Sequence, residues 1–249
     1  MTNTIILGDG GLGRAIEAAL VARTRTDPGH GWVRVLGRPR DGRHDPHELA
    51  GADLLIEASR ADAVVANLIA GLEAGARHAV IATTGWPADR PRVDSLLREY
   101  GAAAVAASNF SLGVVLFGRL VETAVELFGS LDEFDPYLVE WHRRTKLDRP
   151  SGTAIDLTRR IVAAHPRLAE VSDLEVASVR AGASPGMHLV GFDAAGETIE
   201  LRLTARDRSA YAAGILVAAD WLGRGTREPG LYPFEPIVDE LIARERIAA

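Results

Sequence analysis

The first part of the chain alternates short apolar runs with longer helical patterns. The apolar runs occupy residues 4–7, 32–36, 54–56, 79–81 and 103–106. Each has the length of a buried strand, and helical patterns follow at residues 61–74, 93–100 and 112–128. Strands that alternate with helices are typical of an open parallel sheet with helices on both faces. The pattern predicts an N-terminal Rossmann-type parallel sheet.

The pattern changes at about Phe134. Strand-like runs at residues 137–141, 175–179, 188–192 and 198–204 follow with one long helix, Gly152–Ala164, among them. Consecutive strands without intervening helices indicate an antiparallel or mixed sheet. The predicted fold class is therefore α/β, with the parallel sheet joined to a smaller α+β domain that has a mixed sheet.

Helical patterns at residues 210–222 and 235–245 close the chain. We expect the closing segment to pack back on the first domain, which gives a first domain of residues 1–110 completed by 215–249. The second domain then covers residues 111–214. The segments that we expect to be linkers are residues 24–31, 38–48 and 224–233.

Composition narrows the function classes. At 249 residues, with 47% hydrophobic and 25% charged residues, the chain has the make-up of a soluble globular protein. A net charge of −6 argues against nonspecific nucleic-acid binding, which needs a basic face. No cysteine is present, so that disulfides and thiolate metal sites are excluded. We expect a cytoplasmic protein without a signal peptide or a membrane span.

A glycine-rich turn follows the first predicted strand and opens the first predicted helix. It reads Gly8-Asp9-Gly10-Gly11-Leu12-Gly13, which is G-x-G-x-x-G between a strand and a helix. In this context the glycines allow a tight turn, a close approach of the backbone to a pyrophosphate, and close packing of helix and strand. The turn predicts dinucleotide binding, with a glycine-rich turn without a ligand as the alternative.

The end of the second predicted strand bears on the choice of nucleotide. An NAD-selective site carries an acidic residue there, whereas this chain reads Leu36-Gly37-Arg38-Pro39-Arg40. Arginine suits a 2′-phosphate through charge-assisted hydrogen bonds. We predict NADPH as the cofactor, with NADH possible, and Arg38 as the residue that binds the 2′-phosphate. Arg40 is a second candidate or a solvated loop charge.

Small and polar residues also follow the next three predicted strands. They include Ser59, Arg60, Thr83, Thr84, Ser108 and Asn109. The carboxyl ends of parallel strands face the ligand in such sheets. From the residues alone, helix capping and turn formation are the simpler explanation of these side chains.

Residues 140–154 concentrate the remaining candidate chemistry. An apolar strand ends there in an imidazole and three cations: His142, Arg143, Arg144 and Lys146. A Pro-Ser-Gly-Thr turn then opens a helix, so that Ser151 and Thr153 present hydroxyl groups beside backbone N–H groups. Such a helix end can bind a carboxylate, and an imidazole or ammonium group beside it can donate a proton. A surface histidine and solvated arginines are the alternative.

Several segments together resemble one family. Residues 140–154 follow the pattern E-x-H-H-x-x-K-x-D-x-P-S-G-T-A with one fixed residue changed, and residues 82–86 follow a G-T-T-G-F turn. Asn109-Phe110-Ser111 with Gly113 matches N-F-S-x-G, and Arg180, Gly182, Gly186 and His188 match R-x-G-x-x-x-G-x-H. These patterns are similar to those of the 4-hydroxy-tetrahydrodipicolinate reductases, also called dihydrodipicolinate reductases, of the diaminopimelate route to lysine.

The resemblance implies an NAD(P)H-dependent oxidoreductase that reduces a small cyclic imine or enamine carboxylate, with the reduction of dihydrodipicolinate to tetrahydrodipicolinate as the expected reaction. It implies that His142 is the general acid and that Lys146 binds substrate and assists protonation. It implies a substrate site at Ser151, Gly152 and Thr153, and we expect Arg143, which departs from the family pattern, to bind a substrate carboxylate as well. It implies a cofactor site at Gly8, Gly10, Gly11, Leu12, Gly13, Arg38, Ser59, Arg60, Ala82, Thr83, Thr84, Ser108, Asn109 and Phe110.

The resemblance also implies a homotetramer that assembles through the second, substrate-binding domain. Neither a nucleic acid, nor a membrane, nor a metal is expected as a partner: His44 and His47 flank Asp45-Pro46 without a second group of ligands in the sequence.

The chain departs from the family pattern at a few positions. Arg143 replaces the second histidine of the central signature, Trp141 is large for its place, and Leu203 and Asp207 replace a histidine and a serine. These changes leave two alternatives open: a relative that reduces another cyclic imine acid in specialised metabolism, or a non-catalytic NADP-binding protein.

Overall fold

The computed structural model describes residues 2–24, 30–39 and 42–248. The chain divides into two compact units, one of Met1–Leu112 with Arg208–Ala249 and the other of Gly113–Asp207. Each unit has its own sheet.

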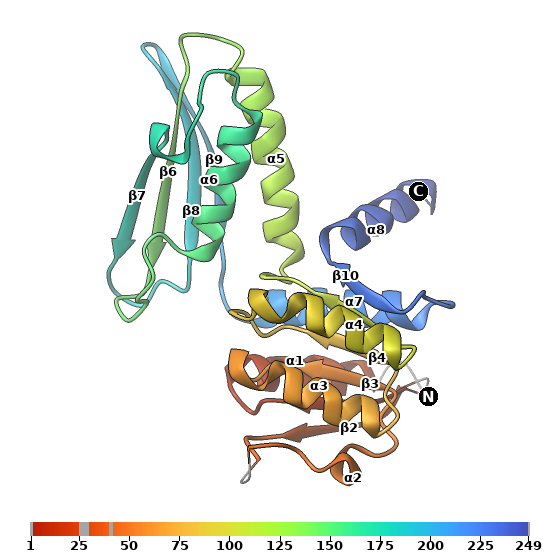
Figure 1. Ribbon diagram of the computed structural model, residues 1–249. Coiled ribbons are helices and arrows are strands. Elements are labelled where there is room, and N and C mark those ends of the chain that lie inside the picture. Colours follow the sequence, from red (N-terminus) through yellow and green to blue (C-terminus); the bar gives the residue numbers. More distant parts are fainter. Residues whose placement is uncertain (1, 25–29, 40–41, 249) are drawn as a thin grey trace. The chain divides into compact units, whose positions relative to one another are not determined.

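The first unit contains a parallel sheet (Figure 1). Its described strands lie in the order β10-β5-β4-β3-β1-β2, and every pair of neighbours is parallel. The strands are β1 (Thr2–Leu7), β2 (His30–Leu36), β3 (Leu54–Glu57), β4 (His78–Ile81), β5 (Ala103–Ala106) and β10 (Gly230–Pro233). All residues of β3 and β5 are buried, because helices cover both faces of the sheet.

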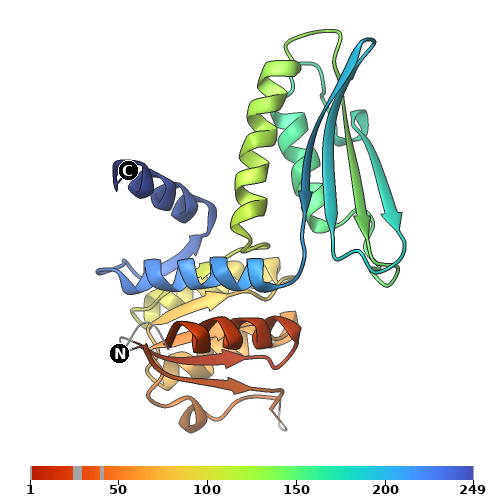
Figure 2. The same ribbon diagram turned by 180° about the vertical axis from the view of Figure 1, so that it is seen from behind.

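Two pairs of helices flank this sheet. Helices α3 (Val64–Glu73) and α4 (Arg90–Glu99) lie on the face that Figure 1 turns to the viewer, and α1 (Gly11–Thr24) and α7 (Ser209–Gly223) lie on the face that Figure 2 shows. The unit also contains α2 (Pro46–Leu49), α8 (Glu235–Ala248) and the single-turn helices η1 (Ala61–Ala63) and η2 (Pro87–Asp89). Ile5, Leu55, Ile81 and Leu97 are fully or nearly fully buried in its core.

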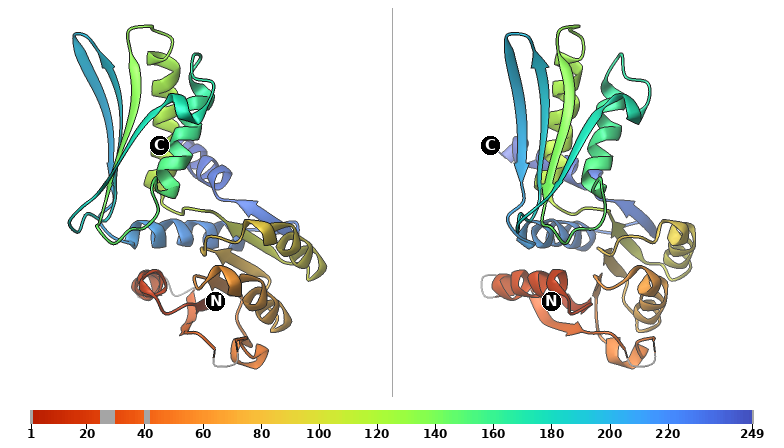
Figure 3. Two further views of the ribbon diagram at one scale, coloured as in Figure 1. Left: turned by 60° about the vertical axis from the view of Figure 1, so that its left-hand side comes forward. Right: turned by 90° about the vertical axis from the view of Figure 1, so that its left-hand side faces the viewer.

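The second unit is a mixed sheet covered by helices on one face (Figure 3). Its strands lie in the order β7-β6-β8-β9, where β6 pairs with β7 in parallel and the other pairs are antiparallel. The elements are α5 (Leu112–Phe128), β6 (Asp135–His142), α6 (Gly152–Ala164), η3 (Val171–Asp173), β7 (Glu175–Arg180), β8 (Met187–Ala194) and β9 (Glu197–Thr204). Phe192, Leu138 and Ile161 form the core between the sheet and the helices.

The predicted fold class is confirmed, but two segments expected to be linkers contain regular structure. Within residues 224–233 lies β10, which extends the sheet at the edge next to β5. This strand begins with Gly230 and ends in Pro233, so it lacks the continuous apolar run by which other four-residue strands, such as β3 and β5, are recognised. Within residues 38–48 the helix α2 begins, capped by the Asp45 carboxylate. None of the described helices is both long and apolar enough to span a bilayer.

Candidate active site

The glycine turn of the first unit is fixed by close backbone packing. Gly8 has φ +117°, and its N–H donates to the carbonyl of Leu36 at the end of β2 over 2.8 Å. A Cβ atom on Gly13 would lie 1.9 Å from the Gly8 carbonyl oxygen, which is far inside contact distance. Both positions therefore require glycine for the fold of the turn itself.

Gly10 and Gly11 have a different environment. A Cβ on Gly10 would have no atom within 4 Å, so that the space above this residue is open at the start of α1. A Cβ on Gly11 would lie 2.7 Å from Nη1 of Arg208, the residue that precedes α7. The turn thus offers an open glycine, a helix N-terminus and a nearby guanidinium, a combination that fits a dinucleotide pyrophosphate. Leu12, also predicted to bind cofactor, is half-buried in the first turn of α1.

The end of β2 carries charges of both signs. Arg38 is exposed there, as expected for a residue that binds a phosphate. The carboxylate of Asp9 lies beside Gly37, since a Cβ on Gly37 would be 3.0 Å from Asp9 Oδ2. An acidic group therefore approaches the end of β2 from the glycine turn, although the sequence of β2 itself lacks one. Arg40 lies outside the described residues.

A buried carboxylate, Glu57, organises the turns after β3 and β4. Its Oε1 accepts hydrogen bonds from the backbone and hydroxyl of Ser59 and from the Thr83 hydroxyl, at 2.9, 2.5 and 2.9 Å. Asn67 Nδ2 donates to Oε2 at 2.8 Å. Burial raises the pKa of Glu57, and these hydrogen bonds only partly offset the effect. Ser59 and Thr83 thus hold the two turns together through Glu57.

The other predicted cofactor residues follow the ends of β3, β4 and β5. Arg60 forms a bidentate ion pair with Asp62, with distances of 3.0 and 2.6 Å. Ala82 is buried, and Thr84 and Ser108 are exposed. Asn109 Oδ1 accepts from the N–H of Ser111 at 2.8 Å, which initiates α5.

Phe110 is 2% exposed and its ring packs 4.9 Å from that of Phe234. Its side chain therefore contributes to the core of the unit, whereas exposed Ser108 and Thr84 remain accessible to a ligand.

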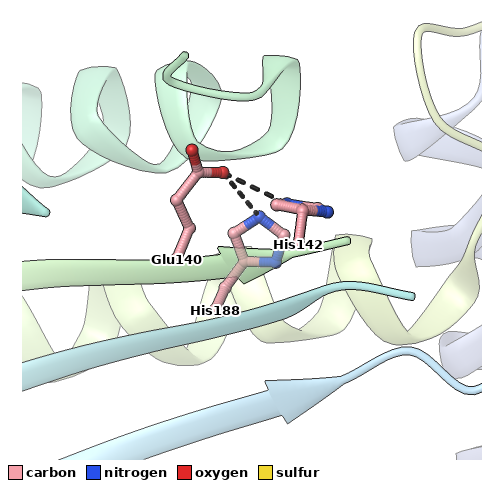
Figure 4. A group of neighbouring side chains, drawn as sticks. All are labelled: Glu140, His142 and His188. Atoms are coloured by element: carbon pink, nitrogen blue, oxygen red, sulfur yellow. Dashed lines mark ion pairs between the residues drawn. The ribbon is translucent and has the colours of Figure 1, made fainter. Parts of the chain in front are cut away.

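In the second unit, the strand pairing brings the acid candidate together with several polar side chains. Glu140 and His142 are two residues apart on β6 and point to the same face of the sheet. Ser178 and Arg180 on β7 lie opposite them, and His188 on β8 lies opposite Glu140. Figure 4 shows Glu140, His142 and His188 turned toward one another.

Glu140 is completely buried and fully paired. Its Oε1 accepts from Arg180 Nη2 at 2.7 Å, from the Ser178 hydroxyl at 2.6 Å and from the N–H of Ser151 at 3.0 Å. Burial alone would favour the neutral acid, but the hydrogen bonds from Ser151, Ser178 and Arg180 lower the pKa of Glu140 to about 2. The carboxylate is therefore ionised at any pH at which an enzyme of this kind would be assayed.

Two histidines face the other oxygen of Glu140. Oε2 lies 3.1 Å from His142 Nε2 and 3.8 Å from His188 Nε2. Burial lowers the pKa of His142, the Glu140 carboxylate opposes this effect, and the cations Lys146 and Arg180 reinforce it. Burial and the neighbouring His142 lower the pKa of His188 to about 4, so that His188 is neutral at neutral pH. The depression is large for His188, so His142 is the more easily protonated of the two rings.

The helix α6 begins beside this pair, as predicted. Ser151 is its N-cap, and its Oγ accepts from the N–H of Ala154 and lies 3.2 Å from His188 Nε2. Gly152 is exposed and Thr153 is half-buried in the first turn. The predicted carboxylate cradle and the predicted acid therefore lie in one cluster.

Lys146 and Arg143 belong to the connection between β6 and α6. Lys146 Nζ pairs with Asp148 at 2.8 Å, and its charge is close enough to depress the pKa of His142. Arg143 is exposed, and its Nε donates to the Thr145 hydroxyl at 3.2 Å. Both cations lie on the solvent side of the cluster.

The ligand atoms of Glu140, His142 and His188 lie within 4.8 Å of one another, close enough for a metal ion. The chemistry of the donors does not suit one. Both oxygens of Glu140 already accept hydrogen bonds, Oε1 from Arg180, Ser178 and Ser151 and Oε2 from Ser151, and the Arg180 guanidinium would repel a divalent cation.

Two of the positions at which the sequence departs from the family pattern, Trp141 and Leu203, have different surroundings in the structure. Trp141 points to the opposite face of β6 from His142, and its indole N–H donates to the Ala181 carbonyl at 2.9 Å. Its indole therefore does not lie in the cluster around Glu140. Leu203, in contrast, lies directly opposite His188 in the β8–β9 pair, so this replacement borders the cluster.

Sequence reasoning gave no role to Glu140, Arg180 and His188. All three were part of the patterns that carried the resemblance. Arg180 is two residues after Ser178 on β7, so the two side chains point to the same face of the sheet. Their convergence depends on the register of three strands, which is not visible in a sequence.

Comparisons with known proteins agree with the fold and with the patterns. Residues 113–238 match the family described as dihydrodipicolinate reductase, C-terminus. The 4-hydroxy-tetrahydrodipicolinate reductase of Wolinella succinogenes is 35% identical over 201 residues, which cover 74% of this chain and 75% of that protein. The enzyme of the same name from Dinoroseobacter shibae is 35% identical, with 90% of this chain and 93% of that protein covered.

Among solved structures, the dipicolinate-bound dihydrodipicolinate reductase of Paenisporosarcina sp. TG-14 has the same fold. It superposes with a TM-score of 0.72 at 20% identity, covering 95% of this chain and 99% of that one. The sequence matches and the shared fold together lead to one conclusion: the chain belongs to the 4-hydroxy-tetrahydrodipicolinate reductase family of oxidoreductases.

Proposed function

We propose that this protein reduces dihydrodipicolinate to tetrahydrodipicolinate with a reduced pyridine nucleotide, in the diaminopimelate route to lysine. The observation that carries this proposal is the cluster of His142 with the N-terminus of α6 in the second unit. A buried imidazole beside a helix N-terminus with a serine cap combines a proton donor with a carboxylate site. A protein that only bound nucleotide would need neither group.

Each residue of the proposed site has a role in binding the substrate or in transferring a proton. The backbone N–H groups of Gly152 and Thr153 and the hydroxyls of Ser151 and Thr153 bind one carboxylate of the substrate, and the charges of Arg143 and Lys146 attract the anion. The bound nicotinamide supplies a hydride to the conjugated imine. His142 donates the proton that completes the reduction, and Lys146 assists by its positive charge.

The cofactor site is assigned to the first unit. The open space above Gly10 and the N-terminus of α1 suit the pyrophosphate, with Leu12 and Gly11 beside it. Arg60, Ala82, Thr84, Ser108, Asn109 and Phe110 belong to the turns that would border the nicotinamide half. Arg38 would bind a 2′-phosphate, which favours NADPH. The Asp9 carboxylate beside Gly37 suits the ribose hydroxyls of NADH, so we propose that both nucleotides are accepted, with NADPH preferred.

The nucleotide preference can be tested at Arg38. Replacing Arg38 with alanine removes a charge-assisted contact to the 2′-phosphate and should raise the KM for NADPH by about tenfold or more. The KM for NADH should change little, because NADH has no 2′-phosphate. Steady-state kinetics with both nucleotides measure the ratio, and Arg34→Ala on the same strand is a matched control. An unchanged KM for NADPH, or equal efficiency of the wild type with NADH, would refute the NADPH assignment.

A second candidate function is the reduction of another cyclic imine carboxylate. Leu203 favours this alternative, because an apolar side chain faces His188 where the family pattern has a histidine. A panel of cyclic imine acids, assayed beside dihydrodipicolinate at equal concentration, distinguishes the two functions by kcat/KM.

We also propose that the protein forms a homotetramer through the second unit. The face of its sheet without helices carries exposed Trp141 and Val179 side by side on β6 and β7, which are apolar enough to be covered by another copy. Sedimentation velocity measures this assembly, and a monomer at micromolar concentration would contradict it.

A further inference from the structure

The feature that the proposed mechanism does not use is the buried ion pair of Glu140 and Arg180. Both side chains are almost fully inaccessible, at 0% and 2% exposure, and their contact distance is 2.7 Å. Burying two charges costs free energy unless their pairing and hydrogen bonds compensate for the lost hydration. Here Ser178 and the backbone of Ser151 supply those additional hydrogen bonds.

The geometry of His142 shows what the pair acts on. His142 Nε2 is buried and has no hydrogen-bond partner among the described residues, although Glu140 Oε2 is 3.1 Å away. The backbone of Pro185 also interacts with the ring and favours its protonated form. Gly186 packs against one edge of the ring, where a Cβ would lie 3.2 Å from Nδ1.

This arrangement makes the charge on the ring depend on Glu140. A neutral ring with the lone pair of Nε2 toward the Glu140 carboxylate would be repelled by it. A proton on Nε2 makes the same contact attractive. The nearby carboxylate therefore favours the protonated form of the ring.

Glu140 also holds the helix end that binds the carboxylate. The N–H of Ser151 donates to both of its oxygens, at 3.0 and 3.2 Å. One buried side chain therefore fixes the imidazole and the start of α6 at the same time. Since Glu140 has no exposed surface, it acts on a substrate only through these neighbours.

We propose that Glu140, neutralised by Arg180, is the positioning residue of the site: it retains the proton on His142 and aligns that proton donor with the N-terminus of α6. The inference rests on the proposed role of His142 as the acid. The groups that face His142 are Glu140 on its own strand, Arg180 on β7, His188 on β8, Lys146 in the following loop, and the Pro185 carbonyl.

The test changes the charge of each partner separately. Glu140→Gln keeps the shape of the side chain but removes the negative charge, so the pKa of His142 should fall by about one pH unit. Arg180→Gln removes the positive charge and should raise the pKa of His142. Glu200→Gln is the matched control, because Glu200 is an exposed carboxylate on β9 that bonds Tyr137 instead. NMR titration of the His142 ring measures its pKa in the three variants.

Kinetics provide the second readout. In the pH profile of kcat, the limb at which kcat falls with rising pH should move to lower pH in Glu140→Gln and to higher pH in Arg180→Gln. Above neutral pH, kcat of Glu140→Gln should be about tenfold lower than that of the wild type. A purely structural role would lower kcat in both variants without opposite movements of the limb.

The titration needs no substrate, so it decides the inference even if the protein does not reduce dihydrodipicolinate. If Glu140→Gln does not fold, Arg180→Gln decides by itself. A pKa of His142 that stays at the wild-type value in the folded variants, or that moves in the same direction in both, would overturn the proposal.

Discussion

Replacing His142 with glutamine should lower kcat by about two to three orders of magnitude, which is the usual contribution of a general acid. Glutamine is similar in size and can still donate a hydrogen bond, but it cannot transfer a proton at neutral pH. The affinity for the nucleotide should not change, because the predicted nucleotide site lies in the other unit of the chain. Single-turnover and steady-state kinetics, with nucleotide fluorescence for binding, measure the two effects.

His47→Gln is the matched control for this variant, since His47 is exposed in α2 and belongs to the first unit. It should retain kcat within about twofold of the wild type. A His142→Gln protein whose kcat stays within about threefold of the wild type would remove His142 from the mechanism.

Alanine at Gly10 and at Gly13 should differ in its effect on stability, although both residues belong to the same turn. The Cβ of Gly13→Ala would lie 1.9 Å from the Gly8 carbonyl oxygen, and the backbone must move to relieve this contact. Such overpacking costs about 1–3 kcal/mol or more, which should lower the melting temperature by several degrees. Nucleotide binding should weaken as a consequence of the distorted turn.

Gly10→Ala meets no protein atom within 4 Å and should melt near the wild-type temperature. Its methyl group would instead occupy the space predicted for the pyrophosphate, so nucleotide affinity should fall by about tenfold or more. Thermal unfolding and fluorescence titration separate the two variants, with Gly196→Ala in the β8–β9 turn as a control at an equally open glycine. If Gly10→Ala binds nucleotide normally, the pyrophosphate does not lie over Gly10.

The sequence predicted most clearly those elements whose burial is uniform. Strands such as β3 and β5 are covered on both faces and read as continuous apolar runs. The helix Gly152–Ala164 was predicted at its observed bounds, because Ser151 provides an N-cap directly after Pro150. In contrast, β10 was missed, since a short edge strand that ends in proline has no periodicity to recognise.

The candidate site was only partly predictable for a similar reason. His142 and Ser151 are close in sequence, and the strand end and helix start between them could be recognised from local patterns. The environment of Glu140 comes from β7 and β8, whose register with β6 brings Ser178, Arg180 and His188 to one place. Pairing of this kind is set by long-range packing, and so are the pKa values that follow from it.

The most direct test of the account is the oxidation of NADPH in the presence of dihydrodipicolinate generated by its synthase. We predict that the wild-type protein oxidises NADPH only while the synthase product is supplied, that His142→Gln does not do so at a comparable rate, and that the wild type rescues a diaminopimelate auxotroph. A wild-type protein that binds nucleotide but oxidises neither NADPH nor NADH with this substrate would contradict the proposed function.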